Sequence, residues 1–491
     1  MSSSKTYASY HLPRLANLPL TAIFIGLALC RPAYGQMPLD SPIRSWLEVG
    51  KIFDVSKSLG SGDSYLTISR LVADRPEAPG SALTAFEENQ SFVYAVGRTN
   101  IYSGSNQGQE LRARLIRRII VLKPSVMVVD DEIRAMESGS PVEWCLHSRN
   151  PAKIFGREGE IIEEAGELSW ETLFPTELAS RQEAPAHGQA GSENIALEVP
   201  TRRNSGNARF IHVFNIQEHG KQIYLVHSAL TADKDEFRLT VSAKNRFFHL
   251  VLPPPEHGAG MISISTSDHK TVLESRPLAA GILPHGPEGT RLLDLWDSDY
   301  RGSRPPMWDI GRPSNELMKV VKEGTVRRCR VVDLCCGSGT DAIYLAGKGF
   351  DVTGIDIAPT ALSQARRKAA AAGVSVQWLF ADVLKPPTLD PFDFIYDRGC
   401  YHVVRDQNLA AYIETLRLLS RPGTRFLLLA SRANEHEANA TTSGVTEEEI
   451  RYDFLKLFDI EWLREIKLES NREEGADPPG WSALFHRNGE R

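Results

Sequence analysis

A glycine-containing turn and two aspartates have the types and spacing that nucleoside binding requires. The turn Cys335–Thr340 contains Gly337 and Gly339, whose lack of a side chain lets the backbone approach a ligand closely. Asp356 ends the next predicted strand, where its carboxylate can accept hydrogen bonds from both hydroxyls of a ribose. Asp382 follows a third strand, where it can accept from an adenine amino group. Together these strand ends predict an adenosine site.

The same turn has a second interpretation. Gly337, Gly339 and Ala342 also satisfy the pattern G-x-G-x-x-A of dinucleotide-binding proteins, and this pattern alone is a weak signal. Asp333 ends the preceding strand, beside the place that a pyrophosphate would occupy, and its negative charge would repel that group. A ligand with a cationic amino group suits the position better. We therefore favour such a ligand over nucleotide-dependent redox chemistry, which stays the alternative.

Alternating strands and helices position these residues. Strands are predicted at Arg330–Leu334, Val352–Asp356, Val376–Phe380, Phe392–Asp397 and Arg425–Ala430, with helices between them. This alternation is typical of a doubly wound parallel sheet, in which ligands bind outside the carboxyl ends of the strands. Two further strand-like runs follow, at Ile460–Leu468 and Trp481–His486.

Four segments of the C-terminal part carry a family resemblance: Pro306–Pro313, Asp333–Gly339, Gly354–Asp356 and Asp397–His402. Through them residues 295–491 resemble class I S-adenosylmethionine-dependent methyltransferases of the thiopurine and thiol S-methyltransferase-like group. The resemblance implies a Rossmann-like methyltransferase domain over residues 306–491, with S-adenosylmethionine as cofactor. The cofactor-binding residues that it implies are Trp308, Asp333, Gly337, Gly339, Asp356 and Asp382. Cys335 departs from the pattern, since most such turns have a glycine there.

Three residues after the fourth strand are candidates for catalysis. Methyl transfer is a direct in-line displacement, so positioning of the acceptor supplies most of the rate, and no metal is expected. Our hypothesis is that the charge of Arg398 favours an anionic acceptor such as a thiolate, with Asp397 or His402 as base. Structural roles for Arg398 and His402 stay open. A small thiol-like acceptor is favoured, although selenium or tellurium species, halides and amines remain alternatives.

Residues 36–285 have short apolar runs and frequent turn residues, which predict an all-β sandwich. Within it, Leu115–Leu122 and Val126–Val129 are predicted to form a hairpin. The segments Tyr94–Ser103, Arg117–Pro124 and Val128–Asp131 resemble the β-sandwich of heparinase II/III-type polysaccharide lyases. No base and charge stabiliser facing each other across a cleft are recognisable, so we expect a non-catalytic domain with possible glycan contact. Residues 286–305 are predicted to be a linker.

Residues 1–35 resemble a signal peptide. Basic residues precede the apolar run Leu18–Cys30, and small residues follow at Ala33 and Gly35. A signal peptide would direct the protein to the periplasm or to secretion. A cytoplasmic location is the alternative, because S-adenosylmethionine is available in the cytoplasm. The alternative function is an envelope polysaccharide-binding or lyase-like protein that carries the methyltransferase domain as a passenger.

The composition narrows the function further. The chain has 491 residues and a formal net charge of −6 without a basic block, so no nucleic acid partner is expected. No apolar run after the N-terminal segment is long enough to span a membrane. The six cysteines lack C-x-x-C spacing and are too few for a disulfide scaffold, so we expect thiols in the C-terminal half.

Overall fold

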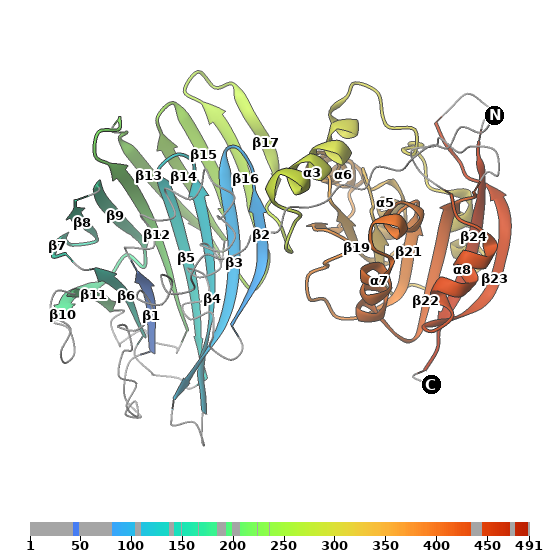
Figure 1. Ribbon diagram of the computed structural model, residues 1–491, viewed down its shortest axis with the longest axis horizontal. Helices are drawn as coiled ribbons and strands as arrows, with labels where there is room; N and C mark the ends of the chain where they lie inside the picture. The colour runs from blue at the N-terminus through green and yellow to red at the C-terminus, as the bar shows by residue number, and fades with distance from the viewer. Residues whose placement is uncertain are drawn as a thin grey trace, which may run out of the picture.

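Two regions lie side by side in the computed structural model: an N-terminal region of β-sheets and a C-terminal α/β region (Figure 1). The structure describes residues 43–48, 81–103, 110–136, 142–148, 150–164, 166–183, 193–198, 207–222, 224–234, 236–433, 444–471 and 477–489. The signal-like segment 1–35 lies outside these residues.

The described residues of the N-terminal region form three sheets. The first has the strand order β1 (Ile43–Glu48), β6 (Val142–Ser148), β11 (Glu193–Glu198), β10 (Ala179–Glu183). The second has the order β2 (Ala82–Glu88), β3 (Phe92–Ser103), β4 (Glu110–Leu122), β5 (Val126–Ala135), β12 (Asn207–Glu218), β9 (Gly166–Phe174), β8 (Glu158–Glu163), β7 (Ala152–Phe155). The third has the order β13 (Val226–Asp233), β14 (Glu236–Ala243), β15 (Arg246–Leu252), β16 (Met261–Thr266), β17 (Thr271–Pro277).

The eight-stranded sheet is covered on both faces. Because successive side chains of a strand point to opposite faces, Tyr94 packs with the five-stranded sheet while Val93 packs with Trp144 of β6. The adjacent Arg117 and Arg118 are both fully buried and pair with Asp131 and Asp130 across the β4–β5 hairpin. The predicted β structure and this hairpin are confirmed. The predicted sandwich is not confirmed, since the described residues of this region form three sheets.

The C-terminal region is a seven-stranded sheet with helices around it (Figure 1). Its strand order is β20 (Gln377–Phe380), β19 (Asp351–Asp356), β18 (Arg330–Leu334), β21 (Phe392–Arg398), β22 (Ser420–Ser431), β24 (Pro479–Arg487), β23 (Phe458–Lys467). The helices are α3 (Gly286–Arg301), α4 (Asn315–Lys322), α5 (Thr340–Gly347), α6 (Pro359–Ala372), α7 (Tyr401–Leu419) and α8 (Glu447–Phe454).

This topology confirms the doubly wound sheet. The first five strands along the chain, β18 to β22, are parallel, and the order reverses at β18, between β19 and β21. The two final strand-like runs are β23 and β24, and β24 is antiparallel to both of its neighbours. The carboxyl ends of β18, β19, β20 and β21 therefore meet at one edge of the sheet, which is the predicted position of the ligand.

The segment predicted as a linker, residues 286–305, contains a helix. Residues 286–301 form helix α3, which begins with Pro287 in its first turn. Pro is favoured there because its missing N–H would be unpaired in any case. Leu292, Trp296 and Tyr300 recur every four residues, and this spacing places them on one face of the helix. The apolar face of α3 packs on the C-terminal region instead of spanning open solvent.

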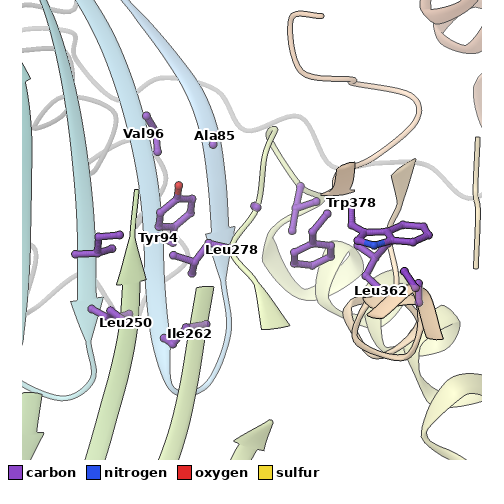
Figure 2. Close-up of a cluster of buried hydrophobic side chains, with 14 of the residues drawn as sticks. Ala85, Tyr94, Val96, Leu250, Ile262, Leu278, Leu362 and Trp378 are labelled. Carbon is purple, nitrogen blue, oxygen red and sulfur yellow. The ribbon is translucent and has the colours of Figure 1, made fainter. Parts of the chain in front are cut away.

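One hydrophobic cluster runs through the junction of the two regions (Figure 2). It joins Tyr94 and Leu250 of the N-terminal sheets to Leu362 and Trp378 of the C-terminal region, through Leu278 on the connecting segment. Leu278 is fully buried. The ion pair of Arg276 and Glu87 is also nearly buried beside this segment. The two regions therefore share a continuous core.

Candidate functional site

A cavity of about 710 Å³ opens at the carboxyl edge of the parallel strands. Asp356 of β19, Asp382 after β20 and Arg398 at the end of β21 lie in its wall. Helix α3 contributes Trp296 and Tyr300 from the other side. This volume is typical of a small-molecule site, and it lies at the switch point that the strand order predicts.

Asp356 joins the glycine turn to the next helix. Its Oδ2 accepts the backbone N–H of Gly337 at 2.7 Å, and its Oδ1 accepts that of Ala358 at 2.8 Å. Burial raises the pKa of Asp356 to about 6, although these backbone donors oppose the rise. Each carboxylate oxygen keeps a second lone pair, so the side chain can also accept from a ligand.

Asp333 lies behind this wall and is 3% exposed. Its Oδ2 has no hydrogen-bond partner among the described residues. Burial raises its pKa well above the ordinary value, and the charges of Asp341, Asp397 and Asp356 add to the effect. The charge of Arg398 opposes the rise. A buried carboxylate oxygen without a partner among the described residues favours a cationic or hydrogen-bond-donating group at this edge.

Trp308 and Tyr300 cover the turn. Trp308 Nε1 donates to the Tyr300 hydroxyl at 2.8 Å, and both rings line the cavity. A Cβ at Gly337 would come within 2.6 Å of that hydroxyl, and Gly337 has φ of 54°. Only glycine fits a turn that has positive φ and a tyrosine so close. Sequence reasoning missed Tyr300, although its spacing from Leu292 and Trp296 could have identified the helix.

Asp382 and Gly339 differ in their position relative to the cavity. Asp382 lines the cavity, and its Oδ1 accepts the backbone N–H of Leu384 at 2.8 Å. Burial raises the pKa of its carboxyl. Gly339 does not line the cavity, because it faces Trp378 and Ala365. Its lack of a side chain therefore serves the packing of α6 against the turn.

Arg398 lies in the cavity wall and holds two backbone segments. Nη1 donates to the carbonyl of Trp308 at 2.8 Å, and Nη2 donates to that of Glu469 at 2.7 Å. Its Nε is buried without a hydrogen-bond partner among the described residues. Arg398 thus fixes the segment of Trp308 against the sheet and places a positive charge beside the cavity.

Asp397 and His402 were expected near the acceptor. Asp397 is fully buried outside the cavity wall, and its carboxylate accepts the backbone N–H groups of Cys400 and Tyr401 at the start of α7. His402 does line the cavity, and its Nδ1 accepts the backbone N–H of Ser431 at 3.4 Å. Burial lowers the pKa of His402 to about 4, so its ring is neutral near pH 7.

Cys335 and Cys400 form a disulfide in the cavity wall, with their Cα atoms 5.6 Å apart. The prediction of thiols at these two positions is wrong. Cys336, which follows in the chain, keeps a free thiol. The bond ties the turn after β18 to the start of α7 across 65 residues of sequence.

Five of the nine predicted site residues share the cavity wall: Trp308, Asp356, Asp382, Arg398 and His402. Gly337 and Asp333 lie directly behind it, whereas Gly339 and Asp397 serve helix packing. Within the residues that the structure describes, no three His, Cys, Asp or Glu side chains converge as a metal site would require. No helix among those residues has the length and hydropathy to cross a membrane.

The C-terminal region is similar in sequence to known methyltransferases. Residues 331–423 match the family model described as a methyltransferase domain. The 2-heptyl-1-hydroxyquinolin-4(1H)-one methyltransferase of Mycobacteroides abscessus is 32% identical over 146 residues, which are 28% of this chain and 64% of that protein. The probable thiol methyltransferase 2 of Arabidopsis thaliana is 23% identical over 136 residues, 27% of this chain and 60% of that protein.

The chain therefore spans less than two thirds of the length of either relative. Among solved structures, the S-adenosylmethionine complex of magnesium protoporphyrin IX methyltransferase from Synechocystis PCC 6803 aligns with a TM-score of 0.28 and 21% identity. That alignment covers 35% of this chain and 76% of the other.

Proposed function

We propose, from the premise that the C-terminal region contains an S-adenosylmethionine-dependent methyltransferase domain, that the protein transfers a methyl group to a small thiol-like acceptor. The observation that carries the proposal is the 710 Å³ cavity at the switch point, with Asp356 in its wall and hydrogen-bonded to the glycine turn. The name of the thiol methyltransferase relative supports the choice of a thiol.

The described residues fit this cofactor. The buried Oδ2 of Asp333, unpartnered among those residues, suits a ligand with a positive charge. Asp356 would accept from the ribose hydroxyls and Asp382 from the adenine amino group. Trp308 and Tyr300 would cover the bound nucleoside. The cofactor supplies an activated methyl group whose transfer requires no metal.

The protein contributes positioning and charge. Arg398 holds the segment of Trp308 in place and, with its fixed positive charge, favours the thiolate over the thiol of an acceptor. Asp397 positions the first turn of α7, which brings His402 to the cavity. Since the pKa of His402 is about 4, its ring is a weak base, and we assign it to orienting the acceptor.

The test is a methyl-transfer assay of the full chain against a panel of small thiols, with calorimetric titration of S-adenosylmethionine. We expect binding of the cofactor and transfer to at least one thiol. Arg398→Ala should raise the KM for the thiol, and Arg398→Lys should restore part of the loss because it keeps the charge. If the titration shows cofactor binding but no thiol is methylated, the proposed cofactor site stands and the thiol acceptor is rejected. Absence of binding would reject both.

A further inference from the structure

A second cavity, of about 630 Å³, lies in the groove between the two regions. The strand β3 and the loop 253–260 form one wall, and α6 with β20 forms the other. Figure 2 shows Tyr94 and Val96 on the first side and Trp378 on the second. The groove shares no lining residue with the cofactor cavity, so it is a separate site.

Arg366 reaches this groove from α6 and has no counter-ion among the residues that the structure describes. Its Nε is buried and has no hydrogen-bond partner among the described residues. The contact recorded for its Nη1 is the thioether sulfur of Met261, which is a weak acceptor. Burial lowers the pKa of its guanidinium, and no carboxylate opposes the effect. A partly buried charge with an unpaired N–H group is costly, and an anion in the groove would offset the cost.

Two further side chains in the lining of the groove, Arg98 and Gln377, carry N–H groups that can donate hydrogen bonds to a ligand. Arg98 of β3 is an exposed arginine in the lining, and its guanidinium can donate to a ligand. The carbonyl of the Gln377 side chain accepts from Thr353, so its amide N–H groups are free to donate. The two carboxylates in the lining are already paired: Glu236 with Arg238, and Glu256 with Arg134.

We infer that this groove binds a small organic anion through a carboxylate or phosphate group held by Arg366 and Arg98. The flat guanidinium group offers parallel N–H donors that match both groups. Trp378 and Pro277 supply apolar surface for the uncharged part of such a ligand, and the volume suits a molecule of that size. The inference does not depend on the methyl acceptor.

The experiment measures the melting temperature of the full chain with inorganic phosphate or with acetate, at constant ionic strength set by sodium chloride. Saturating S-adenosylmethionine is present throughout, so that anion binding in the other cavity is blocked. We expect at least one of the two anions to raise the melting temperature of the wild type. The anion that raises it more shows whether the groove prefers a phosphate or a carboxylate group. Arg366→Gln should abolish the shift. The adjacent Arg367 pairs with Glu274 outside the groove, so Arg367→Gln should keep it.

The melting temperature of Arg366→Gln can also be compared with that of the wild type in the absence of phosphate and acetate. If Arg366 has no counter-ion in the protein, Arg366→Gln should melt at or above the wild-type temperature, because it removes an unpaired, partly buried charge. A clear loss of stability in Arg366→Gln without anion would mean that the arginine has a protein partner, and would overturn the inference. So would the absence of any shift with both anions, or an equal loss of the shift in Arg367→Gln.

Discussion

At the scale of single residues, Asp356 has two tasks. Its carboxylate accepts the backbone N–H groups of Gly337 and Ala358, and the residue also lines the cavity. The first task shapes the turn between β18 and α5, and the second is available to a ribose. A change at this residue therefore affects both the shape of the turn and the affinity for the cofactor.

We predict that Asp356→Ala weakens S-adenosylmethionine binding by at least about tenfold, the loss expected for a hydrogen bond to a charged group. Calorimetric titration measures it. Asp351 begins the same strand at the opposite edge and has an exposed side chain, so Asp351→Ala is the matched control. Equal affinity of Asp356→Ala and wild type would contradict the assignment.

The pH dependence of binding tests the same carboxylate. Its pKa is raised to about 6, so it becomes protonated, and loses acceptor capacity, as the pH falls through 6. Affinity for S-adenosylmethionine should therefore decrease by up to about tenfold between pH 6 and pH 5. Asp356→Asn cannot titrate, and its weaker binding should vary less over this range. An identical pH profile for the variant would exclude Asp356 as the titrating group.

At the scale of elements, the cavity depends on helix α3, which lies outside the sheet. Tyr300 on its inner face accepts from Trp308 and lies close to Gly337 of the turn. Arg398 on β21 holds the carbonyl of Trp308. Three elements that are distant in sequence therefore fix one side of the cavity.

Tyr300→Phe should weaken cofactor binding about three- to tenfold, since it removes one hydrogen bond at Trp308 and leaves the ring in place. Its circular dichroism spectrum should match the wild type. Leu295 is exposed on the same helix, so Leu295→Ala should leave binding unchanged. Loss of binding in both variants would indicate a general dependence on α3 instead of the tyrosine hydroxyl.

The disulfide links two elements across the cavity wall. Mass spectrometry after alkylation without reductant should find Cys335 joined to Cys400. Cys400→Ser should lower the free energy of unfolding, and the chain-entropy model gives about 4 kcal/mol as the upper range for a loop closed over 65 residues. Cys329 has a free thiol, and Cys329→Ser should change stability much less. Alkylation of both cysteines in the unreduced protein would contradict the bond.

At the scale of the whole molecule, the two regions share a core. Leu278 is fully buried between the N-terminal sheets and the C-terminal region, and the cluster around it is continuous (Figure 2). The Arg276–Glu87 ion pair lies beside it. We therefore expect the regions to unfold together.

Leu278→Ala should lower the free energy of unfolding by about 2–5 kcal/mol, the usual cost of such a cavity. Denaturation followed by circular dichroism and by tryptophan fluorescence should show one transition that shifts as a whole. Leu225 is exposed, and Leu225→Ala should have little effect. Two transitions, of which the variant moves only one, would show that the regions unfold independently.

The sequence alone determined the features that depend on near neighbours in the chain. Alternating strands and helices, the β4–β5 hairpin and the strand-end positions of Asp356 and Asp382 follow from patterns a few residues long, and the structure has them where predicted. Hydrophobic periodicity, turn residues and the Gly and Pro residues that end helices and strands act over short stretches of chain. They can therefore be recognised from the sequence without knowledge of the fold.

Tertiary structure decided the contacts between distant residues. It placed Tyr300 over the turn, paired Cys335 with Cys400, and brought Arg98 and Arg366 to one groove. It also places Asp397 outside the cavity wall, at the start of α7. These outcomes depend on how helices and sheets pack, and packing is set by the combined shapes of surfaces that no single stretch of sequence contains.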